Sequence, residues 1–254
     1  MSIVIETKDL KKVYGGKVRG FTAIDGIDIK VEEGEFLGIM GPSGAGKTTL
    51  LNLISTIDMP TEGNIYFESK DITKLKNKEL ALFRRAKIGF IFQEFNLLDT
   101  MTVEDNIALP LALSKMNSSE IRSKVKELSE FFGIDKHLNN YPYELSGGQK
   151  QRTAAARAII TEPSVIFADE PTGALDSKSS GELLHCLSNM NKKFNKTIIM
   201  VTHDAFAASY CKRILFIKDG KIHAKLDKNE SRKEFFGRIL EMLAALGGAV
   251  NELF

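Results

Sequence analysis

The chain has 254 residues, so it forms one large domain or two small ones and can bury a sizeable core. Hydrophobic residues make up 43% and charged residues 27%, a globular balance that excludes a disordered tail protein. The formal net charge of +2 argues against a surface built for nucleic acid, although a local basic patch stays open, so we expect no nucleic-acid partner.

Cysteine usage and apolar stretches indicate where the chain works. Cys186 and Cys211 have no C-x-x-C spacing, which favours a reduced, cytosolic setting. Glu6 interrupts the apolar N-terminus before it reaches the length of a signal peptide, so we expect no export. The apolar stretch at 239–250 is interrupted by Glu241 and is too short to span a membrane. Any membrane role would therefore come through a partner.

The N-terminal part of the chain predicts two kinds of β-structure. Short alternating runs at 3–5 and 23–29, with turn glycines at 15–16 and 34, indicate an antiparallel region. A buried strand is expected at 36–40, followed by a glycine-rich loop and a helix at about 47–57. Continuous apolar runs at 165–168 and 197–201 predict further buried strands, and together these strands suggest a parallel sheet covered on both faces.

The remaining segments read as helices. Ile121, Val125, Leu128 and Phe132 recur at helical spacing, and a helix is expected at 148–160, so the region of about 95–160 is predicted to be a helical subdomain. A second stripe from Phe235 to Leu246 predicts a helix that stops at 247–248, within a C-terminal extension of about 229–254. We expect one domain over 1–254.

The strongest motif is a loop of the form G-x-x-x-x-G-K-[ST] between the expected strand and helix. Its glycines let backbone N–H groups wrap phosphate oxygens, Lys47 faces the β- and γ-phosphates, and the Thr48 hydroxyl suits Mg²⁺. The alternative is a glycine-rich turn that binds nothing, but the flanking elements favour a nucleoside triphosphate site. The residues expected to bind the nucleotide here are Gly41, Pro42, Ser43, Gly44, Ala45, Gly46, Lys47, Thr48 and Thr49.

Two acids and a histidine follow the other expected strands. Ligands of parallel sheets collect at the carboxyl ends of strands, where Asp169, Glu170 and His203 would lie. Because neighbouring strand residues point oppositely, we expect Asp169 to hold Mg²⁺ and Glu170 to orient or deprotonate the attacking water. His203 would hydrogen-bond a γ-phosphate oxygen or the water. The alternatives are two solvated acids and a structural histidine.

A second glycine-containing loop, residues 145–149, opens the helix expected at 148–160. Ser146 is a natural N-cap, and the glycines leave N–H groups free to grip a phosphate, although the pattern also fits a merely capped helix. Because the helical insert would separate this loop from the loop at 41–49, a phosphate held by both would lie between two molecules. A dimer with nucleotide between its subunits follows as a hypothesis.

Together these residues resemble the motifs of an ABC-transporter ATPase. The resemblance covers essentially the whole chain and rests on segments 41–49, 91–94, 145–149, 167–171, 174–176 and His203. It implies that Gln93 reaches the metal and the water, and that Glu170 is the catalytic base. It further implies that Asp176 contacts the partner subunit, that Ser146 and Gly148 clamp the partner's γ-phosphate, and that Tyr14 stacks on adenine. For Tyr14 an ordinary core aromatic is the alternative.

A finer resemblance is carried by segments 92–98, 171–178 and 207–211 and by the C-terminal stretch. These are similar to the lipoprotein-release and macrolide-efflux group, and within it to Bce-type ATPases for bacitracin and other antimicrobial peptides. The resemblance implies a homodimer at the cytoplasmic face of the membrane, bound to a permease and often working alongside a sensor histidine kinase. Phe95, Leu97, Leu98 and Met101 are candidates for the permease socket, or else buried residues of the helical subdomain.

We therefore predict an α/β P-loop ATPase with a parallel core sheet, an N-terminal antiparallel β region and an inserted helical subdomain. A soluble ABC ATPase of translation or DNA repair is disfavoured, because the chain has one cassette and no heptads between the two glycine-containing loops. A small-molecule kinase would leave the loop at 145–149 unexplained. A regulatory ATPase that signals through a membrane partner without moving substrate stays open as the alternative function.

Overall fold

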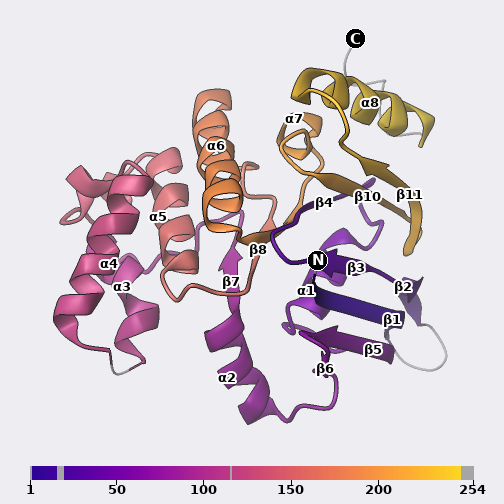
Figure 1. Ribbon diagram of the computed structural model, residues 1–254, viewed down its shortest axis with the longest axis horizontal. Coiled ribbons are helices and arrows are strands. Elements are labelled where there is room, and N and C mark those ends of the chain that lie inside the picture. The colour runs from indigo at the N-terminus through magenta and orange to yellow at the C-terminus, as the bar shows by residue number, and fades with distance from the viewer. Residues whose placement is uncertain (1, 16–19, 115, 247–254) are drawn as a thin grey trace.

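The computed structural model describes residues 2–15, 20–114 and 116–246, and its strands form two sheets with helix α1 (Lys47–Ile54) between them (Figure 1). The antiparallel sheet confirms the expected N-terminal β region. Its strands are β1 (Ile3–Tyr14), β2 (Phe21–Ile27), β3 (Lys30–Glu32), β5 (Glu62–Phe67) and β6 (Lys70–Asp71). Of the expected turn glycines, Gly15 has φ 92° and Gly34 has φ 72°, and Gly16 lies outside the described residues.

The second sheet has the order β11-β10-β4-β9-β8-β7, and all neighbours in it run parallel except β10 and β11. The three predicted buried strands, β4, β9 and β8, are adjacent at its centre. The strands are β4 (Phe36–Met40), β7 (Ile88–Ile91), β8 (Val165–Asp169), β9 (Thr197–Val201), β10 (Arg213–Lys218) and β11 (Lys221–Asp227). This confirms the expected parallel core sheet.

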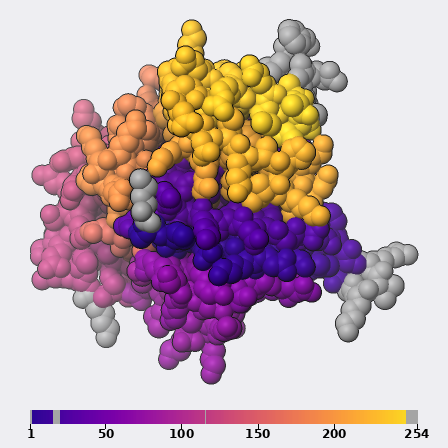
Figure 2. Space-filling view, turned by 45° about the vertical axis from the view of Figure 1, so that its right-hand side comes forward, coloured from indigo at the N-terminus to yellow at the C-terminus, as the bar shows by residue number. Residues whose placement is uncertain are grey.

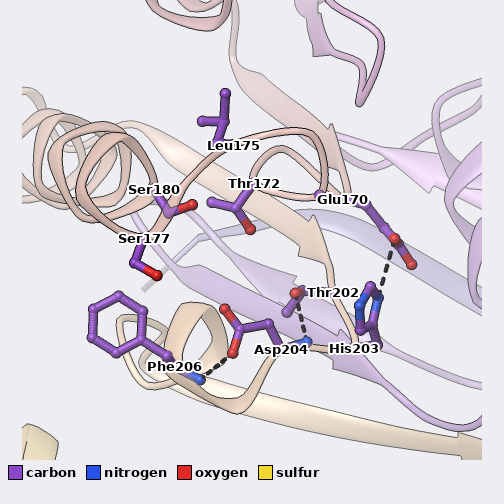
Figure 3. Close-up of a pocket in the computed structure, with 10 residues that line it drawn as sticks. Glu170, Thr172, Leu175, Ser177, Ser180, Thr202, His203, Asp204 and Phe206 are labelled. Atoms are coloured by element: carbon purple, nitrogen blue, oxygen red, sulfur yellow. Dashed lines mark hydrogen bonds and ion pairs between the residues drawn. The ribbon is translucent and has the colours of Figure 1, made fainter. Parts of the chain in front are cut away.

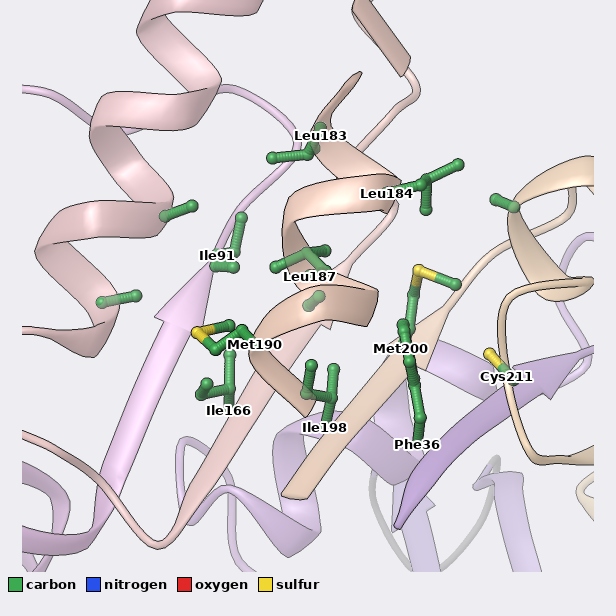
Figure 4. Close-up of a cluster of buried hydrophobic side chains, with 14 of the residues drawn as sticks. Phe36, Ile91, Ile166, Leu183, Leu184, Leu187, Met190, Ile198, Met200 and Cys211 are labelled. Carbon is green, nitrogen blue, oxygen red and sulfur yellow. The ribbon is translucent and has the colours of Figure 1, made fainter. Parts of the chain in front are cut away.

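Alternate residues of the central strands face two different hydrophobic clusters, as the period of two in a strand requires. On one face, Phe36, Ile166, Ile198 and Met200 pack against the helices that follow β7 and β8 (Figure 4). On the other face, residues such as Leu37 pack with α1 and the antiparallel sheet. Both faces of the sheet are therefore covered, which explains why its strands read as continuous apolar runs.

Most of the helices connect one strand to the next along the chain, and α8 follows the last strand. They are α2 (Asn77–Lys87), α3 (Val103–Ala112), α4 (Ser118–Phe131), α5 (Gly147–Ile159), α6 (Ser177–Phe194), α7 (Ala205–Ala208) and α8 (Arg232–Ala245), with short 3-10 turns η1 (Asp135–His137) and η2 (Pro142–Glu144). The predicted helices agree with α4, α5 and α8. Figure 2 shows the C-terminal segment packed on the N-terminal β region, where Lys221 Nζ lies 3.0 Å from Asp25 Oδ2.

Two boundaries need comment. Helix α1 ends at Ile54 rather than 57, because Thr56 adopts a left-handed conformation with φ 62° that ends the helical path. The expected helix stop at 247–248 lies outside the described residues. The division of the chain into one domain with a subdomain at about 95–160 and an extension at about 229–254 stays a prediction.

Candidate nucleotide-binding site

The glycine-rich loop joins β4 to α1 in a conformation that only glycine accepts at its two ends. Gly41 has φ 151°, and a Cβ there would lie 2.0 Å from the carbonyl oxygen of Ile217. Gly46 has φ 100° and is the N-cap of α1, where no side chain caps the helix and no acid occupies the first turn. The first N–H groups of α1 are thus left available to an anion, which the helix dipole also favours.

Lys47 lies within this loop rather than in solvent. Its side-chain ammonium donates to the carbonyl oxygens of Gly41 and Pro42, both at 2.9 Å, and the residue is 8% exposed. Burial lowers the pKa of Lys47, while the nearby carboxylates of Glu170 and Asp169 oppose that shift. The lysine is therefore held at the loop, next to two acids.

The register of the parallel strands brings the other predicted residues to the same edge. Asp169 pairs with Val201 and Ile91 pairs with Ala168, so the segments that follow these strands lie side by side. Thr48 Oγ1 lies 3.4 Å from Asp169 Oδ1. Burial raises the pKa of Asp169, and the charge of Glu170 raises it further, against smaller opposing effects of Thr48 and Lys47.

Glu170 reaches its position by a route that differs from the prediction. Strand β8 ends at Asp169, and Glu170 follows in a left-handed turn with φ 45°. The expectation that Glu170 belongs to the strand is therefore wrong, because the chain turns at this residue, and strand pleating does not apply to it. Non-glycine residues in this conformation carry strain that is often found at functional sites.

His203 and Glu170 meet across the mouth of a cavity of about 510 Å³ (Figure 3). His203 Nδ1 lies 3.1 Å from Glu170 Oε2, and the histidine side chain is 68% exposed against 24% for the glutamate. The cavity extends from this pair between the start of α6 and α7, where Ser177, Ser180 and Phe206 line it.

Gln93 lies beside the same turn. A Cβ added at Gly173 would come within 2.9 Å of the Gln93 side-chain nitrogen, so the amide packs directly on the turn that follows Glu170. The four residues predicted to carry the candidate socket follow Gln93, and none of them is buried. Leu98 is 43% exposed, and Phe95, Leu97 and Met101 are half-buried. The alternative that they are buried residues of the helical subdomain is therefore wrong.

The loop before α5 lies apart from the loop at 41–49. Ser146 is the N-cap of α5, as expected, and it forms a capping box in which its hydroxyl accepts from Gln149 N at 3.3 Å. Side chains added at Gly147 or Gly148 would meet Leu175 and Ser179. Helix α5 packs on β7, and two strands, β8 and β9, separate β7 from β4. Strands β7 and β4 are therefore about 14 Å apart across the sheet.

Two further predicted residues have local partners. Asp176 caps α6, with Oδ1 accepting from Ser179 N at 2.9 Å and Oδ2 from Ser179 Oγ at 2.7 Å. Tyr14 ends β1 and is 41% exposed, so it is not a core aromatic. Its hydroxyl donates to Asp58 Oδ2 at 2.7 Å, and Lys12 Nζ lies 4.8 Å from the centre of its ring.

Two residues of α5 tie the site together, and the sequence motifs did not single them out for this role. Gln151 is fully buried, and its amide nitrogen donates to the carbonyl oxygens of Phe92 and Pro171, at 3.0 and 2.8 Å. These acceptors precede Gln93 and follow Glu170. Arg157 donates to the carbonyl oxygens of Phe95 and Asn96, and burial lowers its pKa. A polar residue on the apolar face of a helix was the available signal for Gln151.

The loop, the buried lysine and the acids at the strand ends define the chain as a P-loop nucleotide-binding protein. Comparison with known proteins agrees, since residues 24–173 match the family model described as ABC transporter. The bacitracin export ATP-binding protein BceA of Halalkalibacterium halodurans is 53% identical over 98% of this chain and 99% of its own. The ABC transporter ATP-binding protein YxdL of Bacillus subtilis is 47% identical over 100% of this chain and 98% of its own.

Solved structures give the same result. A dimeric structure of a post-hydrolysis state of the ATP-binding cassette MJ0796, bound to ADP and Pi, has a TM-score of 0.82 and 38% identity, over 89% of this chain and 100% of that chain. The chain belongs to the ABC transporter family, as its ATP-binding, ATP-hydrolysing subunit. Within the part of the chain that the structure describes, no helix is both long and apolar enough to cross a bilayer.

Proposed function

We propose that this chain drives a transporter that removes peptide antibiotics of the bacitracin kind from the cell envelope. Two copies would clasp two ATP molecules at the cytoplasmic face of the membrane, each bound to a permease. The 53% identity to a bacitracin export ATP-binding protein over nearly the full length of both chains supports the substrate class. The separation of the loop at 41–49 from the loop before α5 is the observation that supports the two-copy arrangement.

In this proposal one copy supplies the cradle and the other the lid. The glycine loop, Lys47 and Thr49 would hold the phosphates of one ATP, with Tyr14 stacked on its adenine. Ser146 and Gly148 of the second copy would then close on the γ-phosphate, and Asp176 would lie at the contact between the copies. Within one chain, two strands separate β4, which leads into the loop at 41–49, from β7, on which α5 packs.

The residues at the strand ends also fit a magnesium ion. Asp169 is a partly buried carboxylate beside a second acid, and both burial and that acid raise its pKa. A divalent cation would stabilise the charged form of Asp169 against both effects. Thr48 Oγ1 is 3.4 Å from Asp169 Oδ1, and Gln93 packs nearby. Mg²⁺ is usually bound by one or two carboxylates and takes its other ligands from phosphates and water. When bound, the ion would neutralise phosphate charge.

Hydrolysis would then be an in-line attack of water on the γ-phosphorus. The water oxygen forms the new bond to phosphorus, the bond to the β-γ bridging oxygen breaks, and ADP leaves with that oxygen. Glu170 would accept the proton that the water loses, while Lys47 neutralises the transferred group. His203, 3.1 Å from Glu170, would hydrogen-bond a γ-phosphate oxygen and hold the carboxylate in place.

The role of Tyr14 gives a prediction for nucleotide affinity. Replacing Tyr14 with alanine is expected to raise the Kd for ATP about tenfold, because stacking of a base on an aromatic ring contributes roughly 1–3 kcal/mol. Tyr14→Phe keeps the ring and loses only the bond to Asp58, so its Kd should stay within about threefold of the native value. Titration with a fluorescent ATP analogue measures both. Equal affinities for Tyr14→Ala and the native chain would contradict the stacking role.

The proposed substrate class is tested in cells that express the chain together with a candidate multi-span permease. Survival in bacitracin should rise several-fold and should fall to the level of empty cells when Glu170→Gln replaces the native chain. The exposed Lys193→Ala serves as the matched control and should protect fully. Protection by the Glu170→Gln chain, or purification without any multi-span partner, would contradict the proposal. ATP turnover and permease binding without protection would instead favour the regulatory alternative, in which a sensor histidine kinase is a natural recipient of the signal.

A further inference from the structure

Helix α7 follows the segment that carries His203 from the end of β9, and it is very short. It spans four residues, Ala205–Ala208, and Asp204 joins it to the histidine. A helix of this length is not stable alone, so its position depends on what packs against it. Its inner side is fixed by the buried residues Ala205, Ala207 and Ala208. Its outer side carries Phe206, which is 38% exposed and therefore gains little from burial in the core.

The outer side of α7 is held by the C-terminal region. The Arg232 guanidinium, at the start of α8, lies 4.4 Å from the centre of the Tyr210 ring and 5.5 Å from that of Phe206. These two rings meet edge to face with their centres 5.6 Å apart. Lys228 Nζ donates to the Ser209 carbonyl oxygen at 2.8 Å. Figure 1 shows α8 lying beside α7.

Short hydrogen bonds fix the backbone from Thr202 to Phe206, the stretch of chain that contains His203. Asp204 caps α7, accepting from Phe206 N at 2.8 Å, and its own N–H donates to the buried Thr202 hydroxyl at 3.0 Å (Figure 3). The second of these bonds joins the two residues on either side of His203. The His203 ring is 68% exposed and its Nδ1 lies 3.1 Å from Glu170 Oε2, so the backbone on either side largely sets where the ring points.

We infer that the C-terminal helix positions His203, with Arg232 as the residue that does so. This rests on the proposed function, in which His203 contacts the γ-phosphate. Arg232 touches neither the nucleotide loop nor Glu170, so it is a positioning residue that acts through Phe206 and the cap of α7. A cation over an aromatic ring is favourable and directional, and a planar guanidinium stacks on a ring in a way that an ammonium does not.

The test is ATP turnover by the isolated full-length chain. Arg232→Ala is expected to lower kcat about three- to tenfold, as the loss of two exposed cation–π contacts implies, while KM for ATP stays within about twofold. Arg232→Lys should recover part of the loss. Lys233→Ala, an exposed lysine on the next residue of α8, is the matched control and should turn over like the native chain. In a Phe206→Leu background, Arg232→Ala should cost markedly less than it does alone.

The outcomes separate this inference from the function it rests on. A kcat for Arg232→Ala equal to that of Lys233→Ala overturns the inference, even if the unfolding temperature falls. A rise in KM without a fall in kcat also overturns it, because the contact would then act on nucleotide binding. Full additivity of Arg232→Ala and Phe206→Leu overturns the proposed route. Absence of ATP hydrolysis by the native chain would instead overturn the assigned activity itself.

Discussion

Replacing Glu170 with glutamine is expected to leave ATP binding intact and to slow hydrolysis at least about a hundredfold. Glutamine keeps the size of the side chain but cannot accept the proton of the attacking water, and a general base contributes about 10²–10⁴-fold. The change also removes one of two adjacent negative charges, which in the proposed mechanism would repel the γ-phosphate. The ATP-bound dimer should therefore persist, and size-exclusion chromatography with ATP and Mg²⁺ should show it.

The matched control for this variant is Glu120→Gln, which changes an exposed glutamate in the first turn of α4. It should hydrolyse ATP at the native rate and should show no trapped dimer. If the Glu170→Gln chain turned over ATP within a factor of two of the native rate, or eluted only as a monomer with ATP and Mg²⁺, the assignment of Glu170 as the base would be wrong. If hydrolysis persisted and the dimer was stable, another residue of the cavity would have to be the base.

Lys47→Ala is expected to weaken ATP binding at least about a hundredfold. The ammonium lies inside the loop, donating to the carbonyl oxygens of Gly41 and Pro42, so in the proposed site it would bind the phosphates at little cost in side-chain freedom. Charge-assisted hydrogen bonds to phosphate are also stronger than neutral ones. Titration with a fluorescent ATP analogue measures the loss directly.

Loss of the Lys47 ammonium leaves two carbonyl groups without that donor, so folding must be checked alongside binding. Circular dichroism of Lys47→Ala should match that of the native chain near room temperature, with the unfolding midpoint lowered by a few degrees. Lys193→Ala, an exposed lysine at the end of α6, should bind ATP normally. An unchanged titration for a folded Lys47→Ala chain would contradict the role of the lysine.

Local chemistry explains what could be predicted from the sequence. The loop at 41–49 is contiguous, and its glycines and lysine act where they stand in the chain. Strands β4, β8 and β9 are buried on both faces and therefore appear as unbroken apolar runs. Because all three end at one edge of the sheet, the sequence also predicted that Asp169, Glu170 and His203 would lie near the loop.

Features that depend on contacts between distant segments could not be predicted in the same way. The cation–π contacts of Arg232 with Tyr210 and Phe206 join residues more than twenty positions apart. Such contacts produce no periodic pattern in the sequence. The left-handed turn at Glu170 follows from tertiary packing, since glutamate has no local preference for φ 45°. Helix α1 likewise ends at Ile54, earlier than predicted, because Thr56 is left-handed.

Gln151 has a consequence for how far the sequence around the site can drift. Its amide binds main-chain oxygens of Phe92 and Pro171, and every residue type presents the same oxygen. A change of side chain at Phe92 or Pro171 would keep the carbonyl oxygen that accepts the hydrogen bond. A change at Gln151 would remove both hydrogen bonds at once. Tolerance to mutation should therefore be sharply uneven here, generous at the acceptors and strict at the donor.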